Sequence, residues 1–227
     1  MPPLVIGVTG SIATGKSSLC RYLVEHHGAV HADGDRVVHR MYEPGRPGFD
    51  RIVQEFGPEV VVADGFIDRR VLGGLVFGKP DRMKALTTAI GDIKGEMQGI
   101  IDGWRATLPD DAVAVIEIVL LIEERYARWC DQTWLVGVDD RIAIPRLMER
   151  NGLTEAEARQ RLASAVPWET RAPAADHVFM NGGTPEAFQQ EIDTVLAETL
   201  ARHRAGTLGE SQYTRWQRAM DEAAGSA

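Results

Sequence analysis

The residues with the clearest chemical potential form a glycine-rich loop near the start of the chain. Gly10, Gly15, Lys16 and Ser17 satisfy the pattern G-x-x-x-x-G-K-[ST], and an apolar run at residues 4–8 precedes them. In such a loop the backbone N–H groups converge on phosphate oxygens, the lysine reaches the β- and γ-phosphates, and the hydroxyl is a magnesium ligand. The sequence therefore predicts a nucleoside-triphosphate site with Ser17 on the metal. The predicted loop contacts are Gly10, Ser11, Ile12, Ala13, Thr14, Gly15, Lys16, Ser17 and Ser18.

A second polar group, Asp33, Asp35 and His39, follows a short apolar run at residues 29–32. Ligands collect at the carboxyl ends of strands in open α/β sheets. A carboxylate beside a triphosphate accepts the proton of an attacking hydroxyl or holds magnesium. Asp-Gly-Asp is also typical of a turn with an N-cap aspartate, but its place after a phosphate loop favours the chemical role. His39 lies one helical turn after Asp35, although a lone helical histidine is commonly packed or solvated.

The elements that position these residues alternate between strands and helices, which predicts an α/β fold of the P-loop NTPase type with a parallel sheet flanked by helices. A helix begins at Lys16 and ends near Gly28. Thr154 and Glu157 have the spacing of a capping box that opens a further helix. Pro145 is awkward inside a helix over residues 139–147 unless that helix starts just before it. The predicted strands are 4–8, 29–32, 113–121, 133–138 and 177–180, and the other predicted helical segments are 36–42, 49–56, 69–77, 80–104, 155–164 and 185–204.

These elements predict three parts and a tail. Residues 1–44, 109–138 and 176–204 form the nucleotide-binding core. Residues 45–108 form a helical insertion on the acceptor side, and residues 139–175 form an arginine-rich helical lid that keeps water from the γ-phosphate. Residues 205–227 are polar and small, which predicts a frayed helix or a disordered tail.

Composition excludes several classes of protein. The net charge of −8 argues against general binding of nucleic acid or anionic membranes. Cys20 and Cys130 stand far apart without a clustered histidine, so the sequence predicts neither a disulfide framework nor a zinc site and favours the reducing cytoplasm. No signal peptide or apolar run of membrane-spanning length is evident, so we expect a cytoplasmic protein.

Ordered motifs extend from the loop to about Arg204, and through them the chain resembles the bacterial dephospho-coenzyme A kinases. The D-x-D, His and E-P-G elements are followed by an I-x-R element, an approximate P-L-L-x-E element, an R-L-x-x-R-x-G-L element and an A-D-x-V-x-x-N-x-G element. The residues that carry these matches are Asp33, Asp35, His39, Glu43, Pro44 and Gly45; Ile67, Arg69, Leu72, Val76 and Phe77; Leu120, Leu121 and Glu123; Arg146, Leu147, Arg150, Gly152, Leu153, Thr154, Glu157 and Ala158; and Ala175, Asp176, Val178, Asn181 and Gly183.

The resemblance implies a reaction in which the γ-phosphate of ATP passes to the ribose 3′-hydroxyl of dephospho-CoA, the last step of coenzyme A biosynthesis. It implies ATP and Mg²⁺ as cofactors and small-molecule substrates for a monomer or small homo-oligomer. Asp35 is then the base, with Lys16 and Arg150 on the transferring group. Arg146 and Asn181 contact ATP, and the expected substrate-binding residues are Asp33, His39, Arg69 and Glu117.

Two alternatives remain open at this point. Gly91 and Asp92 stand where the family pattern has His-Pro, and Val119 stands where it has the proline of P-L-L. These departures favour a related P-loop kinase that acts on a nucleoside or nucleotide. The other alternative is a catalytically weak ATP- or CoA-binding regulatory paralogue, which the presence of Lys16 and Asp35 opposes. A switch-type GTPase lacks support because no N-K-x-D motif occurs.

Overall fold

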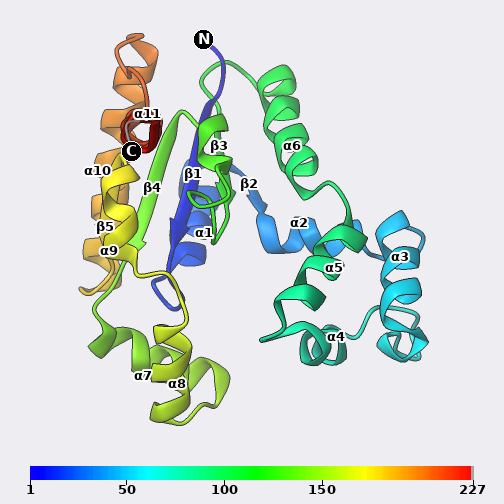
Figure 1. The fold of residues 1–227 in the computed structure, drawn as a ribbon. Coiled ribbons are helices and arrows are strands. Elements are labelled where there is room, and N and C mark those ends of the chain that lie inside the picture. Colours follow the sequence, from blue (N-terminus) through cyan, green and yellow to red (C-terminus); the bar gives the residue numbers. More distant parts are fainter. Residues whose placement is uncertain (226–227) are drawn as a thin grey trace. The chain divides into compact units, whose positions relative to one another are not determined.

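The computed structural model describes residues 1–225, and within that range it has a five-stranded sheet (Figure 1). The strand order is β2-β3-β1-β4-β5, and β1 pairs in parallel with β3 and β4, as β4 does with β5. The predicted parallel α/β fold is therefore confirmed. The strands are β1 (Leu4–Gly10), β2 (Val30–Asp33), β3 (Val113–Glu117), β4 (Gln132–Gly137) and β5 (His177–Met180).

The chain divides into two compact units. The sheet unit comprises Met1–Ala32 and Ile101–Ala227, and the helical unit comprises Asp33–Ile100. The helical unit therefore begins earlier and ends earlier than the insertion predicted at residues 45–108. The helices of the sheet unit are α1 (Lys16–His27), α7 (Asp140–Asn151), α8 (Glu155–Ala163), α9 (Trp168–Arg171), α10 (Pro185–Arg204) and α11 (Gln212–Gly225).

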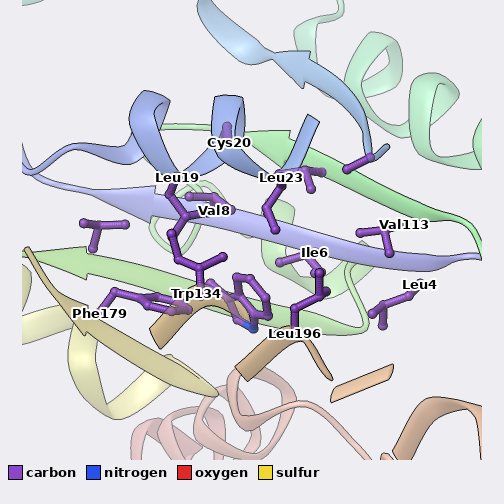
Figure 2. Packing of buried hydrophobic residues seen from close by; sticks show 14 of the residues in the cluster. Leu4, Ile6, Val8, Leu19, Cys20, Leu23, Val113, Trp134, Phe179 and Leu196 are labelled. Atoms are coloured by element: carbon purple, nitrogen blue, oxygen red, sulfur yellow. The ribbon is translucent and has the colours of Figure 1, made fainter. Parts of the chain in front are cut away.

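The core of the sheet unit is built around β1, which is buried along its whole length. Alternation along the strand directs Leu4, Ile6 and Val8 to one face, where they pack with residues of α1 and α10 (Figure 2). The opposite face is crowded at Gly7, where a Cβ would lie 2.8 Å from Leu121 and 2.9 Å from Cys130. Only glycine fits there without displacing a neighbour. This packing on both faces fixes the strand that leads into the glycine-rich loop.

The helical unit has its own apolar cluster, which includes Ile52, Phe56, Leu72 and Val76. Its helices are α2 (Gly34–Met41), α3 (Pro47–Phe56), α4 (Arg69–Val76), α5 (Pro80–Ile90) and the first part of α6 (Ile93–Thr107). The Asp68 carboxylate caps α4 by accepting the backbone N–H groups of the second and third residues after it.

The continuous segment predicted at residues 80–104 was wrong, because the chain breaks into α5 and α6 at Gly91. Gly91 adopts a φ of 110°, which residues with a Cβ rarely adopt. The Arg51 guanidinium donates hydrogen bonds to the carbonyls of Ala89 (2.7 Å) and Ile90 (3.0 Å), which satisfies the end of α5. The departure from the family pattern at this point thus coincides with a capped break between two helices.

Two further boundaries differ from the prediction. The strand predicted at 113–121 stops at Glu117, and the apolar run continues as a turn in which Leu121 is buried and the Thr9 hydroxyl donates to the carbonyl of Val119. Helix α7 begins at Asp140, so Pro145 lies inside it. An early start is possible because the Asp139 carboxylate accepts the N–H of Arg141 and caps the helix, while the proline removes a single intrahelical bond.

Most of the tail predicted as frayed or disordered is ordered: residues 205–211 form a connection and Gln212–Gly225 form helix α11. Tyr213 of α11 is 1% exposed. One carboxylate oxygen of Asp176 accepts the N–H of Gln212 at 2.8 Å and the other accepts the N–H of Thr133 at 2.7 Å, so Asp176 ties α11 to β4. Residues 226–227 of the predicted tail lie outside the described residues. Within residues 1–225, the helices are too short or too polar to cross a membrane.

Candidate active site

The glycine-rich loop joins the end of β1 to the start of α1, as the sequence predicts. A side chain at Gly10 would meet the carbonyl oxygen of Val136, and one at Gly15, which has a φ of 98°, would meet the amide of Asn181. Ala13 adopts the left-handed region with a φ of 61°, a conformation that glycine would adopt without strain. The loop therefore keeps the turn of a phosphate-binding loop despite having alanine at this position.

Side chains hold the loop in its wound form. The Lys16 ammonium donates to the carbonyl of Ser11 at 3.1 Å, and the amide of Asn181 donates to the carbonyl of Thr14 at 2.8 Å. Helix α1 starts at Lys16 and has no acidic residue in its first turn. The positive end of the helix, the backbone N–H groups of the loop and the lysine thus form a site for an anion with several oxygens.

A carboxylate lies against the loop at the end of β3. The Ser17 hydroxyl donates to Glu117 Oε1 at 2.7 Å, and His31 Nε2 lies 3.5 Å from Glu117 Oε2. Burial raises the pKa of Glu117, whereas His31, the Ser17 hydroxyl and the Lys16 ammonium lower it. The lowering is larger, so the pKa of Glu117 is below its ordinary value. Glu117 is predicted among the substrate-binding residues, whereas its carboxylate accepts a hydrogen bond from Ser17, the predicted metal ligand.

Some of the predicted ATP-side residues, from distant parts of the chain, line one cavity of about 420 Å³, whereas Ser11, Ile12 and Thr14 of the loop line a second cavity of about 650 Å³. Arg146 and Arg150 of α7 face it together with Asn181, Gly15 and Ser18. Figure 1 shows α7 at the end of the sheet where β1 and β4 terminate. Tyr22 and Phe188 contribute aromatic surface to the same cavity. The structure therefore brings together cations for phosphate and apolar surface suited to a planar base.

The remaining predicted residues lie in the helical unit. Asp33 caps α2 by accepting the N–H groups of Asp35 (2.9 Å) and Arg36 (3.3 Å), so the N-cap interpretation of this aspartate is confirmed. Asp35, in the first turn of α2, is exposed. The Arg69 guanidinium donates to His39 Nδ1 at 2.8 Å. These contacts bring Arg69 and His39 together from separate helices.

His39 and Arg69 line a cavity of about 510 Å³ with two further arginines, Arg36 and Arg40, and with Tyr42 and Phe66. Burial and the charge of Arg69 lower the pKa of His39, although Asp35 and Asp33 act in the opposite direction. Because an arginine only donates, His39 Nδ1 accepts and the ring is neutral in this arrangement. The cavity combines fixed positive charge with aromatic surface.

Sequence reasoning missed His31, Cys20 and the aromatic residues of the ATP-side cavity. His31 lies two residues before Asp33 in β2, and Cys20 lies three residues after Ser17 in α1. These spacings place each residue on the same face of its element as a predicted site residue, which was the weak signal available in the sequence. The expectation that neither cysteine has a nearby histidine was wrong. Ligand atoms of Cys20, His31 and Glu117 all lie within 4.8 Å of one another.

Comparison with protein families matches residues 4–186 to the dephospho-CoA kinase family. A dephospho-CoA kinase from Streptomyces avermitilis is 35% identical over 209 residues, which cover 92% of this chain and 99% of that protein. A dephospho-CoA kinase from Enterococcus faecalis is 37% identical over 199 residues, with 87% and 98% covered.

Solved structures share the fold. The crystal structure of TT1252 from Thermus thermophilus has a TM-score of 0.71 and 29% identity, and covers 87% of this chain and 98% of its own. A dephospho-CoA kinase from Campylobacter jejuni has a TM-score of 0.57 and 22% identity, with 86% and 97% covered. Both matches extend over more than four fifths of this chain.

Proposed function

Because the chain belongs to the dephospho-CoA kinase family, we propose that it transfers the γ-phosphate of ATP to the ribose 3′-hydroxyl of dephospho-CoA, the last step of coenzyme A biosynthesis. The observation that carries the proposal is the complete phosphate loop, with Lys16 at the start of α1 and Ser17 hydrogen-bonded to Glu117, in a chain of this family. Phosphoryl transfer depends mainly on positioning and charge stabilisation, which such a loop supplies.

On the donor side, the loop N–H groups and Lys16 hold the β- and γ-phosphates of ATP. Lys16 exchanges its present contact with the carbonyl of Ser11 for phosphate oxygens. Arg150 and Arg146 bind the same phosphates from α7, where the planar guanidinium matches two oxygens at once. Asn181 supports the loop through Thr14 and lines the cavity that receives the nucleotide.

The donor set beside the loop fits Mg²⁺. A serine hydroxyl and a carboxylate held below its ordinary pKa are hard oxygen ligands, and Glu117 Oε2 accepts no hydrogen bond within the described part of the chain. Ser17 and Glu117 would hold the ion. The chemistry that it supplies when bound is neutralisation of charge on the β- and γ-phosphates.

On the acceptor side, Asp35 takes the proton of the ribose 3′-hydroxyl as the oxygen attacks the γ-phosphorus. Arg69 binds the acceptor, which carries a pyrophosphate group of its own, and Arg36 and Arg40 add positive charge to the same cavity. Neutral His39 orients Arg69 through the 2.8 Å hydrogen bond. Asp33 fixes the start of the helix that carries Asp35.

A coupled assay of ADP release tests this function. ATP and Mg²⁺ are supplied with dephospho-CoA, with adenosine, with AMP or with no acceptor. Rapid ADP release that requires dephospho-CoA, with coenzyme A as the product by mass spectrometry, is the expected result. ADP release only with adenosine or AMP would assign another acceptor, and ATP binding without transfer to any acceptor would indicate a regulatory paralogue.

A further inference from the structure

We infer that Cys20, His31 and Glu117 form a binding site for Zn²⁺ or a chemically similar transition-metal ion, separate in its chemistry from the oxygen site for Mg²⁺. The three side chains come from α1, β2 and β3 of the sheet unit. Their ligand atoms, a sulfur, an imidazole nitrogen and a carboxylate oxygen, lie within 4.8 Å of one another. Sulfur and nitrogen ligands favour zinc, whereas Mg²⁺ prefers oxygen alone.

The distances suit a metal after small side-chain movements. In a tetrahedral zinc site, bonds of about 2.3 Å to sulfur and about 2.0 Å to nitrogen place those two ligand atoms roughly 3.5 Å apart. His31 Nε2 and Glu117 Oε2 are already 3.5 Å apart. The other ligand atoms, which lie within 4.8 Å of one another, must move by on the order of 1 Å to bind one ion, and rotation of the side chains allows such movements.

Burial supplies an independent indication of a ligand. Glu117 is 7% exposed, and its Oε2 atom accepts no hydrogen bond from the residues that the structure describes. A buried carboxylate oxygen whose nearest donor is His31 at 3.5 Å is costly unless a cation completes its contacts. Cys20 is fully buried, whereas the His31 side chain is 26% exposed, so solvent reaches the cluster through the histidine. Three protein ligands leave a fourth position for water.

Binding of zinc would change the ligands available at the donor site. The Cys20 thiol loses its proton to solvent as the metal–sulfur bond forms, while His31 binds as the neutral imidazole. Glu117 then binds zinc through Oε2, the oxygen nearest His31, while Oε1 keeps its contact with Ser17. This second part rests on the proposed function: if Glu117 Oε2 serves the Mg²⁺–ATP site, zinc inhibits the kinase by occupying that oxygen.

Cobalt binding tests the site without reference to activity. Co²⁺ is titrated into the full-length, reduced, metal-free chain without a histidine tag, and absorption is recorded. One equivalent should produce a thiolate-to-cobalt charge-transfer band and tetrahedral d–d bands, and Zn²⁺ should displace them. Cys20→Ser should remove the charge-transfer band, whereas Cys130→Ser, which alters the other buried cysteine, should keep it.

His31→Asn provides a second variant at a partly exposed position, where folding is less at risk. Zinc affinity, measured by competition with a chromophoric chelator, should fall at least about tenfold, because loss of even an outer-shell contact costs that much in metal sites. A wild-type spectrum without a charge-transfer band, or an unchanged spectrum in Cys20→Ser, would overturn the site.

Kinase activity is then measured separately with added Zn²⁺. The wild-type enzyme should be inhibited at concentrations that leave Cys20→Ser active, and both should be equally active without zinc. If zinc binds but both proteins keep full activity, the inhibitory role is overturned while the site stands. A wild-type chain inactive without zinc would refute the proposed function alone, because the cobalt spectra do not depend on turnover.

Discussion

The phosphate-binding loop of the sheet unit and the cationic cavity of the helical unit are built differently. In the loop, Lys16, Ser17 and Asn181 each have a hydrogen-bonding contact within the protein, and Glu117 is buried. In the cavity, Arg69 is exposed and its contact with His39 fixes one pair, and Asp35 of the same helical unit is also exposed. The comparison indicates that the donor site is organised before ATP binds, whereas the acceptor site depends more on its ligand for order.

Asp35→Asn should produce the largest effect and should separate the two regions. Loss of a general base lowers kcat by about 10²- to 10⁴-fold. The affinity for ATP should be nearly unchanged, because Asp35 belongs to the helical unit. Steady-state kinetics and equilibrium binding of ATP provide the two measurements. Asp64→Asn, an exposed aspartate of the same unit, is the control and should retain kcat. A wild-type kcat in Asp35→Asn would show that Asp35 is not the general base.

Lys16→Ala should lower kcat by about 10²- to 10³-fold, since the variant removes a positive donor from the group being transferred. In contrast to the first variant, it should also weaken ATP binding. Arg21→Ala, a change at an exposed cation on the same helix, should alter neither quantity and controls for loss of charge on α1. If Lys16→Ala turned over at the wild-type rate, the loop would not be the donor site.

Arg69→Ala should have a smaller effect, confined to the acceptor. The removal of a charge-assisted hydrogen bond worth about 1.5–3 kcal/mol raises the KM for dephospho-CoA by about 10- to 100-fold. The KM for ATP should not change. The neighbouring exposed Arg70 supplies the matched control, Arg70→Ala. An equal rise in both KM values would show that Arg69 supports the fold of the helical unit rather than the acceptor.

The same comparison explains which features the sequence could predict. The loop, the parallel sheet and the capping box at Thr154 depend on neighbouring residues and strict spacing, so local patterns predict them. The run at residues 113–121 was predicted as one strand because it is almost continuously apolar. That pattern does not show that Leu121 must turn back to fill the space over Gly7.

Contacts between segments that are distant along the chain could not be predicted from local sequence patterns. Glu117 and Ser17 are 100 residues apart, and their hydrogen bond depends on the register of β1 with β3. The tail appeared disordered because it is polar, yet Tyr213 is buried and Asp176 holds the first turn of α11. The cluster of Cys20, His31 and Glu117 likewise requires three elements to meet, which spacing along one chain does not reveal.

The smallest expected effect is that of Glu117→Gln on stability, measured without ATP and Mg²⁺ and therefore apart from the turnover that depends on this proposed Mg²⁺ ligand. It examines how the donor site is organised. The pKa of Glu117 is below its ordinary value of 4.5 in the folded chain, so its ionised form adds stability above that value and loses it as pH falls through the folded pKa. The free energy of unfolding should therefore fall more steeply for wild type than for Glu117→Gln between about pH 6 and about pH 3, by at most about 1.4 kcal/mol per pH unit.

Urea denaturation across that range measures both slopes. Glu25→Gln, at an exposed glutamate of α1, should keep the wild-type slope and controls for loss of one carboxylate. A Glu117→Gln slope equal to wild type would mean that burial offsets the contributions of Ser17, His31 and Lys16. The free-energy cost of burying the carboxylate would then equal the stabilisation that these neighbours provide. The donor site would be organised by the backbone conformation of the loop rather than by charge.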